Sequence, residues 1–145
     1  GYTTASDARW LQHQGVQSVL SLHKPLPHQQ LKTLHLPLTE GYLSHETIVK
    51  GATFIREQAQ ARRTILTTCV NGTGLSVTFA IIGLKEVEQL SLREAFIAVR
   101  RHNQHAMPDH LHWEALRRYY GEGDLFWDVW QDIIEDEHKP NAAYA

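Results

Sequence analysis

The chain has 145 residues, a formal net charge of −2 and a hydrophobic content of 42%. This length and composition predict one domain with a substantial core, and the near-neutral charge gives no reason to expect nucleic acid as a partner. No apolar run is long enough to span a membrane, no N-terminal signal pattern is present, and a single cysteine excludes an internal disulfide, so we expect a cytoplasmic, reducing location without membrane contact.

Three short apolar segments bounded by turn residues predict buried strands at 16–22, 33–38 and 64–69. Between the second and third, Ser44 is placed to cap a helix that ends near Ala61. Its apolar residues recur at steps of four, three and four and form one face: Ile48, Ala52, Ile55 and Ala59. Strands that alternate with helices and are then followed by helices alone predict an α/β fold with a parallel-rich sheet flanked by helices.

The third strand leads into the segment Thr-Ile-Leu-Thr-Thr-Cys-Val-Asn-Gly-Thr-Gly-Leu-Ser at 64–76, which holds the only cysteine, Cys69. A strand that turns directly into a helix leaves backbone N–H groups unpaired, and glycines allow those groups to point into one concavity. That positive field favours an anion and is expected to lower the pKa of the thiol. The alternative is that Cys69 is a small buried hydrophobe at a strand end. We favour an anion-binding loop, whose backbone donors would come from Val70, Asn71, Gly72, Thr73, Gly74 and Leu75.

After this loop the pattern stays helical. Ser91-Leu-Arg-Glu94 is a capping box, and apolar residues follow it at core spacing. Ten histidines are many for this length, but the group at 102, 105, 110 and 112 matches no common zinc pattern, so we expect neither a metal nor a cofactor.

The segment 124–137 predicts an amphipathic, strongly acidic helix. Its apolar face comprises Leu125, Phe126, Val129, Trp130, Ile133 and Ile134. We expect this helix to close a single domain at 1–137, with 138–145 as a tail. The alternative is a helix that binds a protein partner, since aromatic anchors with an acidic rim suit docking.

The 64–76 segment resembles the signature of cysteine-dependent protein phosphatases, His-Cys-x-x-Gly-x-x-Arg-Ser/Thr. Cys69, Gly72 and Ser76 match it, whereas Thr68 stands at the His position and Leu75 at the Arg position. The resemblance implies that Cys69 is the nucleophile and that Ser76 supports the departure of its sulfur. Beyond the loop, the chain resembles a dual-specificity phosphatase domain over roughly its residues 5–120. The segments that carry this resemblance are 5–22, 34–38, 78–89, 91–100 and 107–108. It implies a sheet of about four strands, with the usual first strand missing or shortened here.

Three departures from the family pattern affect catalysis. Leu75 cannot clamp phosphoryl oxygens, and the loss of one such donor typically costs about 100–1000-fold in rate. Thr68 offers only a hydroxyl where the family has His. The family's general-acid Asp is absent here, and the residues nearest to its position are Thr39 and Glu40. Glu40 is therefore the candidate acid; the alternative is that Glu40 is an ordinary exposed carboxylate. A substitute arginine would have to come from elsewhere, and we expect the candidates to be solvated surface charges: Arg56, Arg62, Arg63, Arg100 and Arg101.

Three functions follow as hypotheses. The first is a catalytically impaired phosphatase-like domain, a pseudophosphatase, that binds a phosphorylated protein or a small phosphate ester at the Cys69 loop. The second is an active phosphoric monoester hydrolase that works through a phosphocysteine. The third is a protein-interaction module that acts through the helix at 124–137.

Overall fold

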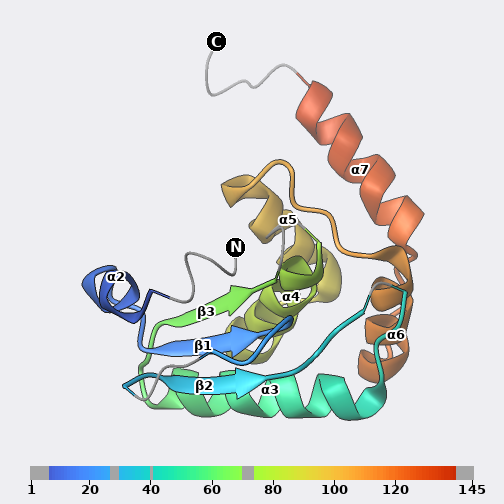
Figure 1. The fold of residues 1–145 in the computed structure, drawn as a ribbon. Helices are drawn as coiled ribbons and strands as arrows, with labels where there is room; N and C mark the ends of the chain where they lie inside the picture. Colours follow the sequence, from blue (N-terminus) through green and yellow to red (C-terminus); the bar gives the residue numbers. More distant parts are fainter. Residues whose placement is uncertain (1–6, 27–29, 40, 70–73, 140–145) are drawn as a thin grey trace.

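A computed structural model describes residues 7–26, 30–39, 41–69 and 74–139 of the chain. In chain order the elements are α2 (Ala8–His13), β1 (Ser18–Ser21), β2 (Lys32–His35), α3 (His45–Gln60), β3 (Ile65–Thr68), α4 (Leu75–Glu88), α5 (Leu92–His102), α6 (His110–Tyr120) and α7 (Phe126–His138). Strands and helices mix in the first half and helices alone follow, which gives the expected α/β fold (Figure 1).

The sheet is parallel throughout, with the strand order β2-β1-β3. Three strands are present in the part of the chain that the structure describes, against the four or so expected from the family resemblance. At the end of β1, Ser21 pairs with His35 of β2 and with Thr68 of β3. The carboxyl ends of all three strands therefore lie at one edge of the sheet, which is where open parallel sheets bind ligands.

Alternate residues of β1 point to opposite faces of the sheet. Val19 packs in a small cluster with Leu11 of α2 and Leu31. Leu20 belongs instead to the main core, whose other members come largely from α3 to α7. The short α2 therefore packs against one face of the sheet and the larger helices pack against the other.

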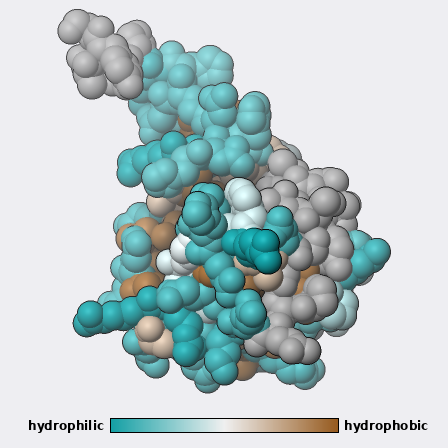
Figure 2. Space-filling view, turned by 60° about the vertical axis from the view of Figure 1, so that its left-hand side comes forward, coloured by the Kyte–Doolittle hydropathy of each residue, from teal (hydrophilic) through white to brown (hydrophobic). Residues whose placement is uncertain are grey.

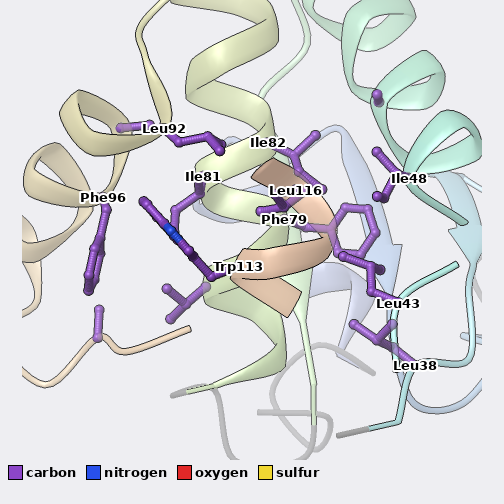
Figure 3. Close-up of a cluster of buried hydrophobic side chains, with 14 of the residues drawn as sticks. Leu38, Leu43, Ile48, Phe79, Ile81, Ile82, Leu92, Phe96, Trp113 and Leu116 are labelled. Atoms are coloured by element: carbon purple, nitrogen blue, oxygen red, sulfur yellow. The ribbon is translucent and has the colours of Figure 1, made fainter. Parts of the chain in front are cut away.

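The centre of the main core is aromatic and aliphatic and is completely buried. Phe79 of α4 lies beside Ile48 of α3, and Trp113 of α6 lies toward Phe96 of α5 (Figure 3). The rings of Phe96 and Trp113 are 5.7 Å apart between centroids. Because α4 contacts α3, α5 and β3, its position is fixed from several sides at once.

The helix starts follow the capping signals of the sequence. The Ser44 side chain accepts a hydrogen bond from the Thr47 N–H at the start of α3, and the capping box at Ser91 is formed as predicted. Helix α6 was not predicted from the sequence. Its cap is Asp109, which directly follows Pro108, and this pair was the available signal for a helix start.

Helix α7 is part of the core. Phe126, Val129 and Ile133 are buried in the main cluster, whereas Leu125 precedes the helix and is 48% exposed. An ion pair from Arg93 of α5 to an α7 carboxylate adds to this packing. On the face seen in Figure 2, the α7 end of the molecule is mainly hydrophilic. The predicted helix is confirmed, with its first residue at 126 in place of 124.

Candidate functional site

The candidate site lies where β3 passes into α4. Strand β3 ends at Thr68, Cys69 follows it, and α4 begins at Leu75 after the cap residue Gly74. The positive end of α4 therefore points toward the carboxyl edge of the sheet, an arrangement that favours an anion. The predicted donors Val70, Asn71, Gly72 and Thr73 lie outside the described residues, so their role stays a prediction.

Cys69 and Ser76 are brought together by this turn. The Cys69 Sγ lies 3.5 Å from the Ser76 Oγ, within hydrogen-bond distance for sulfur, and both residues are buried. The Thr67 hydroxyl also reaches the first turn of α4, where it donates to the Ser76 carbonyl oxygen. The sulfur therefore has a hydroxyl beside it that can stabilise a thiolate, as the proposed role of Ser76 requires.

Thr68, at the family's His position, is also buried. Its hydroxyl has no hydrogen-bond partner among the residues that the structure describes. A buried polar group of this kind normally finds a partner, because leaving it without one costs about 1–3 kcal/mol. The hydroxyl is thus available to the adjacent loop or to a bound group.

Leu75, at the family's Arg position, packs partly against the main core. It also lines an apolar cleft formed with the turn before α6 and the start of α7. A leucine side chain in this place offers contact area but no hydrogen-bond donor. Among the described residues that line the cleft there is no arginine or lysine either.

Three of the candidate substitute arginines bond elsewhere: Arg56 with Glu86, Arg63 with Gln58 and Arg100 with Glu137. Only 9% of the Arg100 side chain is exposed, and its guanidinium also lies 4.9 Å from the centre of the Trp130 ring. The expectation that Arg100 is a solvated surface charge is therefore wrong. It belongs to the packing between α5 and α7, so it is not a spare clamp for phosphate.

Glu40, the candidate general acid, lies outside the described residues, but both of its neighbours are placed. Thr39 forms an isolated antiparallel bridge with Tyr42, and Gly41 has a φ of 76°, a conformation that glycine adopts readily. The chain therefore reverses direction between Thr39 and Tyr42, beyond the carboxyl end of β2, and we call this place the 39–42 turn.

Two residues that were not predicted as site residues hold this turn, the α6 cap residue Asp109 and His112 in the first turn of α6. One oxygen of the Asp109 carboxylate accepts the Gly41 N–H at 2.6 Å, while the other caps α6 by accepting the Leu111 N–H at 2.8 Å. The ring of His112 is fully buried and lies 3.0 Å from the Thr39 carbonyl oxygen. Of the grouped histidines, only His112 was in a position to do this, because the other three are exposed.

The proton positions on His112 follow from its partners. The Thr39 carbonyl can only accept a hydrogen bond, so Nε2 carries the proton. In a neutral ring Nδ1 then accepts from the Thr78 hydroxyl of α4, which lies 3.1 Å away. A single buried imidazole thus connects α6, α4 and the 39–42 turn.

The electrostatics of Asp109 reflect the same contacts. Burial alone would raise the pKa of this carboxyl, but the N–H donors of Gly41 and Leu111 and the neighbouring His112 outweigh it, so its pKa lies below the usual range. Asp109 is therefore held as a carboxylate that anchors the turn.

Within residues 7–26, 30–39, 41–69 and 74–139, no group of three or more His, Cys, Asp or Glu side chains is placed to hold a metal ion. Over the same residues, no helix has the length and apolar character needed to cross a membrane.

Comparison with known proteins identifies the architecture. No protein-family profile matches the chain, and no curated protein matches its sequence. Human DUSP28 superposes with a TM-score of 0.71 at 20% identity over 80% of this chain and 85% of its own. DUSP15 superposes with a TM-score of 0.73 at 16% sequence identity, over 98% of this chain and 91% of its own. The human tyrosine phosphatase-like serine/threonine/tyrosine-interacting protein superposes with a TM-score of 0.71 at 20% sequence identity, over 83% of this chain and 87% of its own. At these identities the likeness shows the fold.

Proposed function

Because the chain has the fold of the dual-specificity phosphatases, we propose that it is a phosphatase-like domain that binds phosphorylated ligands at the Cys69 loop and hydrolyses them poorly or not at all. The observation that carries this proposal is the environment of Leu75. Leu75 takes the place of the family's phosphate-clamping arginine. It packs partly against the core and lines an apolar cleft.

Ligand binding is supported by what the site keeps. Cys69 is buried and directly follows β3, the N-terminus of α4 lies just beyond it, and the Ser76 hydroxyl is within reach of the sulfur. Backbone N–H groups at such a helix start bind anions without any cationic side chain. The conformational freedom for that cradle is expected from Gly72 of the signature, because Gly74 itself has a φ of −121°, which residues other than glycine also adopt.

Weak catalysis is supported by what the site lacks. Transition-state charge on a transferred phosphoryl group is stabilised mainly by preorganised donors, and one missing donor costs about 100–1000-fold. No arginine lines the described cleft beside Leu75, and Arg100 bonds elsewhere. The backbone N–H groups at the start of α4 do not depend on that arginine, so a weaker ground-state binding of phosphate can persist where transition-state stabilisation is lost.

A working phosphoric monoester hydrolase is the second candidate, favoured by the contact of Cys69 with Ser76 and by the anchored turn around position 40. In this mechanism the thiolate attacks phosphorus, an S–P bond forms and the P–O ester bond breaks. Glu40 gives its proton to the leaving oxygen. Water then attacks the phosphocysteine, and phosphate and the Cys69 thiolate are released.

A protein-interaction module acting through 124–137 is the third candidate. Much of the apolar face of this segment is buried within the domain, so a partner there would meet mainly its acidic side and the exposed Trp127. The phosphocysteine mechanism needs a reduced thiol, so with that function we propose a reducing, cytoplasmic compartment.

The test compares the native protein with Cys69→Ser in two assays, hydrolysis of an aryl phosphate near pH 6 and calorimetric binding of inorganic phosphate. We expect negligible turnover in both proteins. We also expect the native protein to bind phosphate and a third protein, the variant Gly72→Val, to lose that binding. Turnover that disappears with the sulfur would establish the hydrolase. A native protein that binds no phosphate would overturn the proposal.

A further inference from the structure

The Trp127 cleft is the apolar hollow beside the Cys69 loop, with a volume of about 300 Å³. The start of α4, the turn before α6 and the start of α7 form it, and its lining includes Gly74, Leu75, Pro108, Asp109, Phe126 and Trp127. Two of these residues, Gly74 and Leu75, lead directly out of the signature loop. A group bound at the loop would therefore have the cleft as its neighbour.

The cleft has a rigid aromatic wall. Phe126 is buried at its base, stacked on Trp130 and edge-on to Trp113. Trp127 stands on this base with its ring centroid 5.0 Å from that of Phe126, and it is 65% exposed. An aromatic ring held in this way presents contact area at little entropic cost on binding.

Two exposed apolar side chains line the cleft itself. Met107 is 40% exposed and Trp127 is 65% exposed. Apolar area that is exposed within one hollow is typical of a binding site, whereas isolated exposed apolar residues are common everywhere.

The charges of the lining indicate which part of a ligand would enter. Among the described residues that line the cleft, Asp109 is the only charged side chain, and its carboxylate is occupied by backbone N–H groups; His110 is the only other titratable one. Within this described lining a phosphate would meet no cation and one carboxylate. The phosphate therefore belongs at the loop, and an uncharged apolar group belongs in the cleft.

The size and openness of the cleft indicate a side chain and not a whole metabolite. Small-molecule sites usually have about 300–1,000 Å³ and enclose most of the ligand. This cleft is at the lower limit, and its tryptophan wall is mostly exposed to solvent. It suits one ring of a ligand whose remainder stays on the surface, as in an extended peptide.

We infer that the Trp127 cleft is a subsite for an aromatic side chain that flanks the phosphorylated residue of a protein ligand. The inference rests on the proposed function, because the phosphate at the Cys69 loop sets the position of the flanking residue. The replacement of arginine by leucine then has a positive consequence, since Leu75 extends the apolar surface from the loop to Trp127.

The experiment measures binding of phosphopeptides to the native protein by fluorescence anisotropy. Two series, one with phosphotyrosine and one with phosphoserine, place Phe at each of the two positions before and after the phosphorylated residue, with Ala elsewhere. All-Ala phosphopeptides and inorganic phosphate measure the loop alone. The same peptides are then tested on Trp127→Ala and on a matched control, Trp10→Ala, which removes another exposed tryptophan that is 47% exposed on α2.

We expect the best Phe peptide to bind at least tenfold more tightly than its all-Ala counterpart, and this gain to vanish in Trp127→Ala but persist in Trp10→Ala. Equal binding of Phe and all-Ala peptides, or a gain that survives in Trp127→Ala, would overturn the subsite while leaving the proposed function in place. Failure of all phosphopeptides and of inorganic phosphate to bind would overturn both.

Discussion

The imidazole of His112 in α6 donates from Nε2 to the Thr39 carbonyl oxygen across 3.0 Å, which ties residues 73 positions apart in the sequence. In a neutral ring its other nitrogen accepts from the Thr78 hydroxyl of α4. This pair of contacts sets the place of the turn beyond the carboxyl end of β2.

Replacing His112 by Phe keeps a ring of similar size but removes both hydrogen bonds. The Thr78 hydroxyl and the Thr39 carbonyl are then left without this partner, and a buried group without a partner costs about 1–3 kcal/mol. We expect a loss of stability in that range, measured by urea unfolding. The matched control, His110→Phe, changes an exposed residue of the same helix and should shift stability by less than about 0.5 kcal/mol. Equal effects of the two changes would contradict the role assigned to His112.

Asp109→Asn tests the carboxylate that anchors Gly41. The folded-state pKa of Asp109 is lowered, so its contribution to stability is fully present above the unfolded-state pKa of about 3.9 and is lost as the pH falls through the folded-state value. We therefore expect the native protein to exceed Asp109→Asn in unfolding free energy at pH 7, with a smaller difference at pH 3. Urea unfolding at both pH values measures this. A difference that does not change with pH would contradict an anchored charge.

Leu75→Arg returns the family's clamp to its position. If the other groups of the site are competent, turnover of an aryl phosphate should rise at least 100–1000-fold, the effect typical of one restored donor. Because Leu75 packs partly on the core, we also expect some loss of stability. Leu75→Met keeps an apolar side chain and should give no gain, and adding Cys69→Ser to Leu75→Arg should abolish the gain. No rise in Leu75→Arg would place the main defect elsewhere, and the general acid would be the next group to test.

Gly51 permits the close approach of α3 and α4. A Cβ at Gly51 would lie 2.0 Å from a ring carbon of Phe79, which is fully buried, so Gly51→Ala has to displace the ring. Overpacking of this kind costs about 1–3 kcal/mol. Gly83→Ala is the control in α4, because its Cβ would meet Ile55 at an ordinary 3.7 Å. That change should be neutral or stabilising by up to about 1 kcal/mol, since glycine weakens a helix interior. Thermal unfolding of both variants decides between these outcomes.

The neighbouring residues Phe126 and Trp127 test whether α7 is part of the domain. Phe126 is 3% exposed and belongs to the main core, so Phe126→Ala should cost about 3–5 kcal/mol. Trp127 is 65% exposed, and Trp127→Ala should cost less than about 0.5 kcal/mol. Chemical unfolding of the two variants gives the comparison. Small losses in both would mean that α7 folds independently of the rest.

Much of the secondary structure could be predicted from the sequence because its signals are local. The cap at Ser44 and the capping box at Ser91 depend on residues within one helical turn, and the structure has both. The predicted strands were somewhat too long, for example 16–22 against Ser18–Ser21, because an apolar run continues past the last ladder pair. Helix α6 was not predicted because its Asp109 cap, between Pro108 and a segment that begins with the two histidines His110 and His112, was not recognised as a helix start.

The site could be predicted only where its residues are close in the sequence. Cys69, Ser76 and Leu75 belong to one strand–loop–helix segment, so their order alone brings them together. His112 and Asp109 could not be assigned in this way, because their partners in the 39–41 segment come from the other half of the chain.

By itself, the sequence determined the strand, loop and helix around Cys69, and it determined that the phosphate-clamping position carries a leucine, because these are properties of a short contiguous segment. The tertiary structure alone decided that Leu75 faces an apolar cleft, that Arg100 is committed to α7, and that α6 holds the turn beside position 40. The physical reason is that hydrogen bonds and packing form between groups that are close in space, and helices from distant parts of the chain come together only when a shared hydrophobic core is buried.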